Sequence, residues 1–443
     1  MILLRFFLAA LFAAPAVLVA AVVGTNPPAL PLTADRIAAL PAPEQKPWRD
    51  YLARSLAQLA ADKKFFADEM RAHHLATPTT PREGRGNSLS LNRPAAWFAT
   101  AEARRLADNV ISFQTPAGGW SKNMNYADHA RQPGELFAPG NAAPAAVEAA
   151  NARAGSVDND KPADPSWHYV GTFDNNATIT QLRFLAAVAA ALDEKSAAPY
   201  RDAVRRGLDY AFAAQFPNGG FPQVYPLEGG YHDTITFNDN ALVNVLSFLT
   251  EVAEAKNGFA FLAADLRARA AACVQRGVAC ILACQIVADG RRTVWCQQHD
   301  ALTLAPASAR NYEMPSQSGS ESDDVAIFLM ALPAPSPAVV ASVHAAAAWF
   351  KKTELRDVAW RPAPDGSGRT LTKAPGAGPL WARYYEIGSD RPLFGDRDKT
   401  IHDDVNEISK ERRNGYSWFN AGPERALALY AKWAEAHPIG TNR

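Results

Sequence analysis

Hydrophobic residues recur every three to four positions over most of the chain, which is the spacing of amphipathic helices. Alternating, strand-like patterns are few and late, around Trp360 and over residues 380–387. The pattern therefore predicts an all-α or mainly α-helical protein. The expected helices cover residues 48–74, 97–114, 177–192, 200–215, 239–255, 263–285 and 336–352.

A weak internal repeat follows three of these helices. Gln114 and Gln215 each precede a proline, a Gly-Gly pair and an aromatic residue, and Gln285 begins a looser third copy. Such repetition is typical of stacked helical hairpins, with glycine supplying the positive φ needed where a helix ends. We expect three hairpins arranged as an (α/α)₃ toroid, with a few short strands and long loops at one rim. Ordinary helix-end chemistry without a ring is the alternative.

The N-terminus has the pattern of an export signal. Arg5 precedes an apolar run over residues 6–23, with small residues near its end where a signal peptidase can cut. We interpret residues 1–24 as a signal peptide and expect a periplasmic or extracellular protein without a stable membrane partner after cleavage. The alternative is an uncleaved anchor, because the run approaches the ~20 residues that span a bilayer.

The rest of the chain divides into two parts. Residues 25–92 read as a Pro/Ala-rich linker and a helical N-terminal extension, and residues 93–443 as the main domain. Within the main domain, residues 133–165 form a long loop with little periodicity, which favours a functional or a disordered segment over a packed one.

Charge and cysteine content narrow the classes of function. The 45 basic residues balance the 45 acidic residues, so whole-chain electrostatics gives no case for nucleic acid or anionic membrane as a partner. We expect a monomer. The cysteines lack the paired CxxC spacing of a zinc site, and either one disulfide or buried free thiols is compatible with their positions. They are Cys273, Cys280, Cys284 and Cys296.

Polar residues gather where the predicted helices begin. Asp174 lies in a Thr-Phe-Asp-Asn run and Asp239 in a Phe-Asn-Asp-Asn run, each opening a helix. Either carboxylate suits an N-cap, but two similar openings on adjacent hairpins also suit a shared rim. Carboxylate oxygens are the ligands that Ca²⁺ prefers, so a calcium site is the second interpretation.

The densest polar stretch covers residues 295–322. His299 and Asp300 resemble a base and its orienting carboxylate, but no nucleophile at a strained turn accompanies them, which disfavours a serine hydrolase. Arg310, with Lys122 and Arg383 elsewhere, has the right chemistry to hold carboxylates. A structural salt bridge is the alternative for each.

The ordered motifs GGWSKN, TFDNNAT, ITFNDNA, WCQQHD, ARNYEMPSQSGSES and RYYEIGSDRPLF resemble family 10 of the polysaccharide lyases. The resemblance runs from about residue 97 to residue 418 and implies an (α/α)₃ toroid. It also implies Ca²⁺-dependent anti β-elimination on α-1,4-linked polygalacturonate, which leaves 4,5-unsaturated oligogalacturonides. The substrate partner would then be pectate.

Motif by motif, the resemblance implies roles for individual residues. Arg310 matches the catalytic base, and Asp174 and Asp239 match positions associated with Ca²⁺. The residues that it implies for substrate binding are Lys122, Asn175, Asn238, His299, Asp300, Tyr312, Glu313, Ser318, Arg383 and Tyr385. Residue physics alone would make Arg310 a carboxylate clamp, because arginine is ordinarily protonated at all accessible pH.

Two other functions are compatible with the sequence. A glycoside hydrolase on an (α/α) barrel would use two carboxylates such as Asp174 and Glu313 as acid and base, and would produce no double bond. A non-catalytic uronate-binding protein would keep Ca²⁺-dependent binding without forming product.

Overall fold

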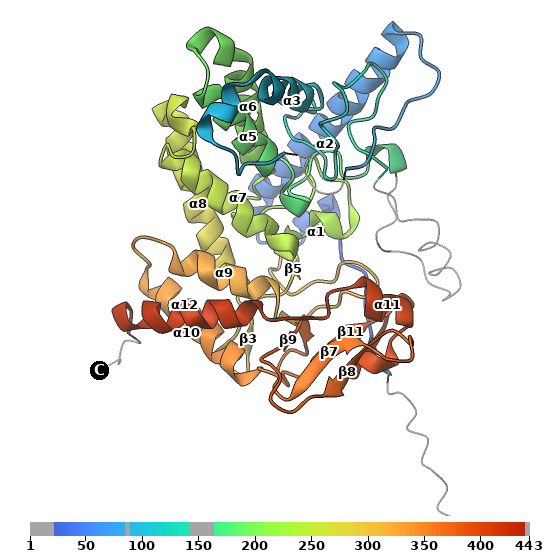
Figure 1. Ribbon diagram of the computed structural model, residues 1–443, viewed down its shortest axis with the longest axis vertical. Coiled ribbons are helices and arrows are strands. Elements are labelled where there is room, and N and C mark those ends of the chain that lie inside the picture. The colour runs from blue at the N-terminus through green and yellow to red at the C-terminus, as the bar shows by residue number, and fades with distance from the viewer. Residues whose placement is uncertain (1–21, 85–88, 141–158, 160–163, 439–443) are drawn as a thin grey trace, which may run out of the picture.

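Three helical hairpins in succession form the body of the protein. The computed structural model describes residues 22–84, 89–140, 159 and 164–438, and its ribbon shows the hairpins stacked along the molecule (Figure 1). Helices α3 and α12 pack against the two ends of this series, on α5 and on α9 and α10. The expected (α/α)₃ toroid with few short strands is confirmed. These helices are α3 (Ala101–Ser112), α5 (Ile179–Ala190), α6 (Glu194–Ala214), α7 (Ala241–Ala253), α8 (Ala264–Cys284), α9 (Glu321–Met330), α10 (Pro337–Lys352) and α12 (Gly422–Ala436).

The glutamine repeat joins each hairpin to the next. The side-chain amide of Gln114 donates to Gly118 O in its own turn and to Ala203 O in α6, at 2.8 and 2.9 Å. Gln215 makes the same pair of bonds to its own turn and to α8, and Gln285 to its own turn and to α10. Since a buried amide must be hydrogen-bonded, this residue fixes the turn and the neighbouring helix together. The predicted repeat is confirmed as a packing device.

The glycines of the repeat are needed for close approach as well as for conformation. Gly118 and Gly219 have φ of 104° and 94°, and a Cβ on either would lie 2.4 or 2.2 Å from a carbonyl oxygen of the next helix. They lie several residues beyond the helix ends, so the expectation that they terminate the helices is wrong. The helices end at Ser112 and Ala214, before the glutamines.

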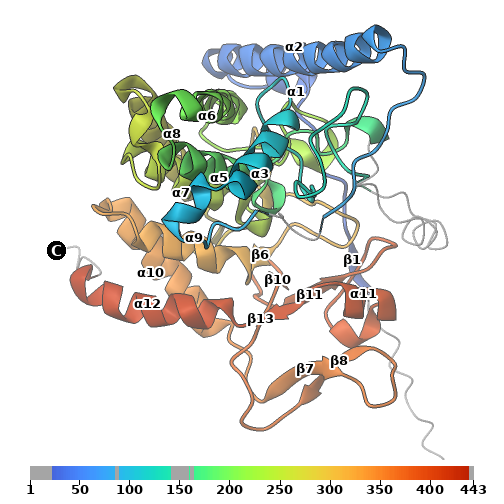
Figure 2. The same ribbon diagram turned by 45° about the horizontal axis from the view of Figure 1, so that its top comes forward.

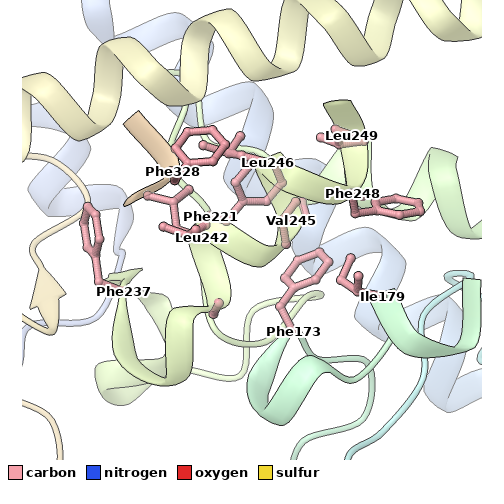
Figure 3. Close-up of a cluster of buried hydrophobic side chains, with 14 of the residues drawn as sticks. Phe173, Ile179, Phe221, Phe237, Leu242, Val245, Leu246, Phe248, Leu249 and Phe328 are labelled. Carbon is pink, nitrogen blue, oxygen red and sulfur yellow. The ribbon is translucent and has the colours of Figure 1, made fainter. Parts of the chain in front are cut away.

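A buried apolar core fills the space between the hairpins. Its central part is drawn in Figure 3, where Phe173 and Phe237 point into the same cluster as Leu242, Val245 and Leu246 of α7. Each phenylalanine immediately precedes one of the polar turns described below. The core therefore anchors those turns from beneath.

The N-terminal segment is packed against this body. Helix α1 (Ala34–Ala38) precedes the long helix α2 (Ala42–Ala72), which lies across one side of the hairpins (Figure 2). Tyr51 donates to Ala214 O at 3.0 Å, and Trp48 contacts Phe216 with ring centroids 5.3 Å apart. The predicted helix in this region is confirmed.

Strands are short and lie mainly in the C-terminal third. One five-stranded antiparallel sheet has the order β1-β12-β11-β10-β6, and its edge strand β1 comes from the N-terminus. The expected strands near Trp360 and over residues 380–387 are confirmed as β7, β9 and β10. The strands are β1 (Val22–Thr25), β2 (Ile235–Thr236), β3 (Val287–Ala288), β4 (Arg291–Arg292), β5 (Gln298–His299), β6 (Gln317–Ser318), β7 (Val358–Pro362), β8 (Arg369–Lys373), β9 (Trp381–Ala382), β10 (Tyr384–Tyr385), β11 (Pro392–Gly395), β12 (Thr400–His402) and β13 (Phe419–Asn420).

Several short helical turns connect these elements, and one further helix, α11 (Lys410–Gly415), lies near the C-terminus. The turns are η1 (Ala95–Ala99), η2 (Pro165–Trp167), η3 (Asp174–Asn176), η4 (Gly230–Asp233), η5 (Asn238–Asn240), η6 (Phe259–Phe261) and η7 (Val405–Glu407).

The cysteines are buried free thiols, which settles the two alternatives for their state. Three of them, Cys273, Cys280 and Cys284, are buried residues of α8. Among the described residues, no helix is long and apolar enough to cross a membrane. Most of the predicted signal peptide and most of the loop over residues 133–165 lie outside the described residues.

Candidate functional site

Two similar turns, η3 and η5, lie side by side where α5 and α7 begin. Each contains a residue in the left-handed region, Asn175 with φ of 51° and Asp239 with φ of 50°. Asn and Asp tolerate this conformation better than other non-glycine residues, which explains the Asp/Asn runs. The turns place Asp174 and Asp239 close enough for each to influence the other's ionisation.

Neither carboxylate caps a helix. The N-cap positions are Thr178 for α5 and Asn240 for α7, and neither helix has a side-chain cap. The two motifs are also offset, because Asp174 corresponds by position in the turn to Asn238, and Asn175 to Asp239. Consequently Asp174 is buried and Asp239 is exposed. The capping interpretation is wrong for both.

Lys122 is the partner of Asp174. Its Nζ lies 2.6 Å from Asp174 Oδ2 and 3.3 Å from the centre of the Tyr169 ring. Although burial opposes ionisation, this ammonium holds the pKa of Asp174 below its ordinary value. The second oxygen, Asp174 Oδ1, is buried and has no hydrogen-bond donor among the described residues. A buried carboxylate oxygen without a donor is suited to bind a cation.

Asp239 has the opposite electrostatic character. Desolvation of the Asp239 carboxylate by the surrounding protein, together with the negative charge of Asp174, raises the pKa of Asp239 to about 6. Its Oδ2 accepts a hydrogen bond from Asn238 Nδ2 at 3.1 Å, and Asn238 in turn accepts from Arg383 at 2.8 Å. Arg383 is also paired with the buried Glu321. A charged carboxylate that raises the pKa of a neighbouring carboxyl is an arrangement that a divalent cation relieves.

Arg310 is held by a two-pronged contact with Glu313. Its Nη2 lies 2.6 Å from Glu313 Oε1 and its Nε lies 3.0 Å from Oε2, and the Tyr416 hydroxyl donates to Oε1 at 2.7 Å. The arginine side chain is 32% exposed, so it is accessible, whereas Glu313 is buried. Although burial disfavours the charged guanidinium, the Glu313 carboxylate raises the pKa of Arg310 above its ordinary high value.

The main chain around Arg310 is fixed from distant parts of the sequence. Buried Asn26 directs its Nδ2 at three carbonyl oxygens, those of Arg310, Asn311 and Glu313, at 3.0, 3.0 and 3.1 Å. Asn159, inside the long loop, donates to Asn311 Oδ1 and to the carbonyl of Ala309. Two distant parts of the chain thus hold the main chain around Arg310 in place. One is the segment just after the predicted leader, and the other is the long loop.

An open polar cavity of ≈ 520 Å³ joins these groups, a size typical of ligand sites. Asp239, Arg310, Arg383 and Tyr416 line it. A larger cavity of ≈ 690 Å³, bounded by Leu91 and other mainly apolar residues, lacks such a convergence of charges. The polar cavity is therefore the candidate site.

Several residues predicted to bind substrate instead make scaffold contacts. Both ring nitrogens of His299 bond main-chain groups, and burial lowers its pKa to about 4. Asp300 caps its own turn and pairs with Arg36 of α1 at 2.5 Å. Ser318 bonds Glu321, and the Tyr385 hydroxyl bonds Thr353 O at 3.0 Å. None of these four is among the residues that line the polar cavity.

Two further predicted residues lie at the edge of the site. Asn175 is exposed on η3, next to Asp174. The Tyr312 ring is buried under the guanidinium groups of Arg397 and Arg412, and it meets the Tyr416 ring edge-on with centroids 5.1 Å apart. Tyr312 therefore shapes the Arg310 loop from behind.

Sequence reasoning missed Asn26, Trp360 and Arg369 as site residues. Trp360 and Arg369 come from the β7–β8 hairpin and line the same cavity as Asp239. No local motif marks them, and 284 residues separate Asn26 from Arg310. Glu321, the buried counter-ion of Arg383, lay within a recognised motif but was assigned no role.

The charges of the site suit an acidic ligand and a cation. Lys122, Arg310 and Arg383 supply positive groups, and Asp174 and Asp239 supply oxygen ligands. Such a set binds a carboxylate and stabilises negative charge that develops beside it.

Comparisons with known proteins agree with this chemistry. A family model described as pectic acid lyase matches residues 114–427. A family 10 polysaccharide lyase from Cellvibrio cellulosa is 33% identical with a TM-score of 0.62, and the match covers 79% of this chain and 99% of that chain. A point mutant of the same description, in complex with trigalacturonic acid, is 33% identical with a TM-score of 0.61, covering 78% and 98%. No curated protein matches the chain.

Proposed function

Because the chain belongs to the pectic acid lyase family and is a pectate lyase, we propose that it cleaves α-1,4-linked polygalacturonate by Ca²⁺-dependent anti β-elimination. The products would be 4,5-unsaturated oligogalacturonides. The observation that carries the proposal is that the accessible Arg310 lines one polar cavity with Asp239, while the buried Asp174 lies close enough to both for their charges to interact. The trigalacturonate bound by the related structure supports an oligogalacturonate as the substrate.

Asp174 and Asp239 would hold the calcium ion. The donor-free Oδ1 of Asp174 and the raised pKa of Asp239 both fit a cation between the two side chains. When bound, Ca²⁺ supplies positive charge to the uronate carboxylate next to the reacting carbon. Lys122 and Arg383 contribute further positive charge on the same side of the reaction.

Arg310 would remove the C5 proton. The carbanion that forms at C5 is stabilised by positive charge on the adjacent carboxylate, and its electron pair forms the C4–C5 double bond as the C4–O4 bond breaks. The leaving oxygen takes a proton from solvent. For this step Arg310 must be neutral, so its bidentate contact with Glu313 has to weaken as substrate and cation enter.

The contact between Arg310 and Glu313 offers a test of whether Arg310 acts as a base or only holds a carboxylate. We expect Glu313→Gln to lower the pKa of Arg310, because the carboxylate that raises that pKa is replaced by a neutral amide. For a base that must be deprotonated, activity rises with pH through this pKa. At a fixed alkaline pH below this pKa, the neutral fraction of Arg310, and with it kcat/KM, should therefore rise by roughly 10-fold for each unit by which the pKa falls. An unchanged or lower kcat/KM at that pH, with the fold intact, would make Arg310 a permanent cation.

Asn26 provides a second test, as a residue that positions Arg310. Asn26→Ala removes the amide shared by three carbonyls of the Arg310 segment, so we expect kcat to fall on the order of 10-fold with KM nearly unchanged. Asn26→Asp should be worse, because it turns an acceptor toward three acceptors. Thr25→Ala, at the exposed last residue of β1 immediately before Asn26, is the control. An equal loss of kcat in the Thr25 control would contradict the role.

The hydrolase alternative fits the site less well. Ion pairs with Lys122 and Arg310 lower the pKa values of Asp174 and Glu313, so neither is suited to donate a proton to a glycosidic oxygen. A non-catalytic uronate-binding protein differs from the lyase only in forming no unsaturated product. Export of the chain, supported by the N-terminal pattern, and a monomeric state remain part of the proposal.

A further inference from the structure

Two histidines and a glutamate converge at a place that the proposed reaction does not use. Nδ1 of His168 lies 2.8 Å, and Nδ1 of His232 lies 3.2 Å, from the same oxygen, Oε1 of Glu228. One potential ligand atom from each residue falls within 4.8 Å of the others. Among the described residues, no other group of three His, Cys, Asp or Glu meets this condition.

The rings approach the carboxylate from different directions. The planes of His168 and His232 are 88° apart, with ring centroids separated by 5.5 Å. His232 stacks on Tyr231 at 4.1 Å and meets Tyr169 edge-on at 4.9 Å, and the backbone N–H of Tyr169 donates to Glu228 Oε2 at 2.9 Å. Packing therefore fixes both imidazoles, and the second carboxylate oxygen already has a partner.

We propose that His168, Glu228 and His232 form a binding site for a divalent transition-metal cation, with Zn²⁺ as the expected ion. Two imidazole nitrogens and one carboxylate are a common ligand set for zinc, whereas Ca²⁺ takes oxygen ligands. Zinc bonds of ~2.0–2.2 Å place neighbouring ligands roughly 3.3 Å apart. The two histidine–glutamate separations of 2.8 and 3.2 Å need only small side-chain adjustments to reach this value, and the ligand nitrogens of the two histidines lie within 4.8 Å of each other.

The surroundings suit an ion that joins two chain segments. The histidine side chains are 2% and 5% exposed and the glutamate is 12% exposed, so the site is nearly closed but open on the glutamate side. His168 follows η2 and His232 lies in η4, 64 residues further on. The Tyr169 ring contacts both histidine rings, with centroids 4.3 and 4.9 Å away, and its centre lies 3.3 Å from Lys122 Nζ. The cation would thus hold in place the segment that carries Tyr169.

The direct test is metal binding by the complete chain in saturating Ca²⁺, so that the proposed calcium site does not compete. The protein is stripped with a zinc chelator, supplied with ZnCl₂ and desalted, and its zinc content is measured. We expect one zinc per chain, and a Tm raised by at least about 2 °C. The Co²⁺ form should show visible d–d absorption without a thiolate charge-transfer band. Wild-type protein that keeps no zinc after desalting would overturn the proposal.

Variants locate the ion. Glu228→Gln and His232→Gln should each reduce zinc affinity by at least about 10-fold. Two controls should keep it: His344→Gln, a histidine whose ring bonds Tyr430 and a carbonyl in another part of the fold, and Cys284→Ser, which lies 3.9 Å from Cys280. Zinc retained by both site variants, or lost only in Cys284→Ser, would contradict this site. The measurement is independent of whether the lyase mechanism is correct.

Discussion

Arg310→Ala is expected to reduce kcat on polygalacturonate by about 10³-fold or more, with substrate affinity changed only a few-fold. A positioned general base contributes roughly 10²–10⁴ to the rate, and Arg310 also supplies charge near the reacting carboxylate. Lys122, Arg383 and the cation remain to bind the substrate, which is why affinity is largely kept. Steady-state assays on polygalacturonate measure kcat, and calorimetry of oligogalacturonate binding measures the affinity for substrate.

The variant needs a folding control, because it leaves Glu313 buried without its counter-ion. An uncompensated buried carboxylate is strongly destabilising, by roughly 3–5 kcal/mol. The double variant Arg310→Ala/Glu313→Gln removes the stranded charge and should recover Tm while staying inactive. If the double variant regains wild-type turnover, Arg310 is not the base.

The second large effect is expected at the two carboxylates. Asp239→Asn should lower activity on the order of 100-fold at limiting Ca²⁺ and raise the Ca²⁺ concentration for half-activity, because one charged oxygen ligand is lost. In the calcium-free protein the same change should leave Tm unchanged or raise it, since it removes the repulsion from Asp174. Calcium titrations of activity and of Tm measure both.

Asp174→Asn is the matched comparison, because this carboxylate has a lysine partner that Asp239 lacks. Removing it should weaken Ca²⁺ binding and also lower Tm, since Lys122 loses its counter-ion in a nearly buried position. Asp108→Asn, whose carboxylate accepts from Tyr200 away from the site, serves as the control. Unchanged calcium dependence in both Asp174→Asn and Asp239→Asn would remove these residues from the cation site.

Local chemistry predicted most of the helical scaffold. The spacing of apolar residues predicts the helices α5, α6, α7, α8 and α10. The repeat of Gln, Pro and Gly-Gly predicts that they are arranged as successive hairpins. Besides the short helices α1 and α11, the sequence pattern did not predict α9 and α12. The first turn of α9 carries three buried polar residues, Glu321, Ser322 and Asp323. Glu321 accepts a hydrogen bond from Arg383, and the Ser322 hydroxyl bonds the Trp295 backbone. Because these buried positions are polar, the sequence of α9 lacks an amphipathic pattern. α12 has the apolar spacing of an amphipathic helix, so it is a helix that the sequence could have predicted.

The sequence predicted only those residues of the candidate site that lie within recognisable motifs. Asp174, Asp239, Arg310 and Arg383 lie in ordered runs, and the structure brings these four to one place. The offset between the two turns can be read in the sequence as Phe-Asp-Asn against Phe-Asn-Asp, but its consequence, with Asp174 buried and Asp239 exposed, follows only from the conformation of the turns. Asn26 reaches the Arg310 loop through strand pairing of β1 with β12, a contact between the two ends of the chain.

The central claim is cleavage by elimination with calcium, and ultraviolet absorbance tests it most directly. Purified protein is incubated with polygalacturonate, and the conjugated double bond of the unsaturated uronide is followed with Ca²⁺, with chelator, and after Ca²⁺ is restored. The account predicts that absorbance rises with Ca²⁺, stops with chelator and resumes on restoration. New reducing ends that appear without any rise in absorbance would contradict it.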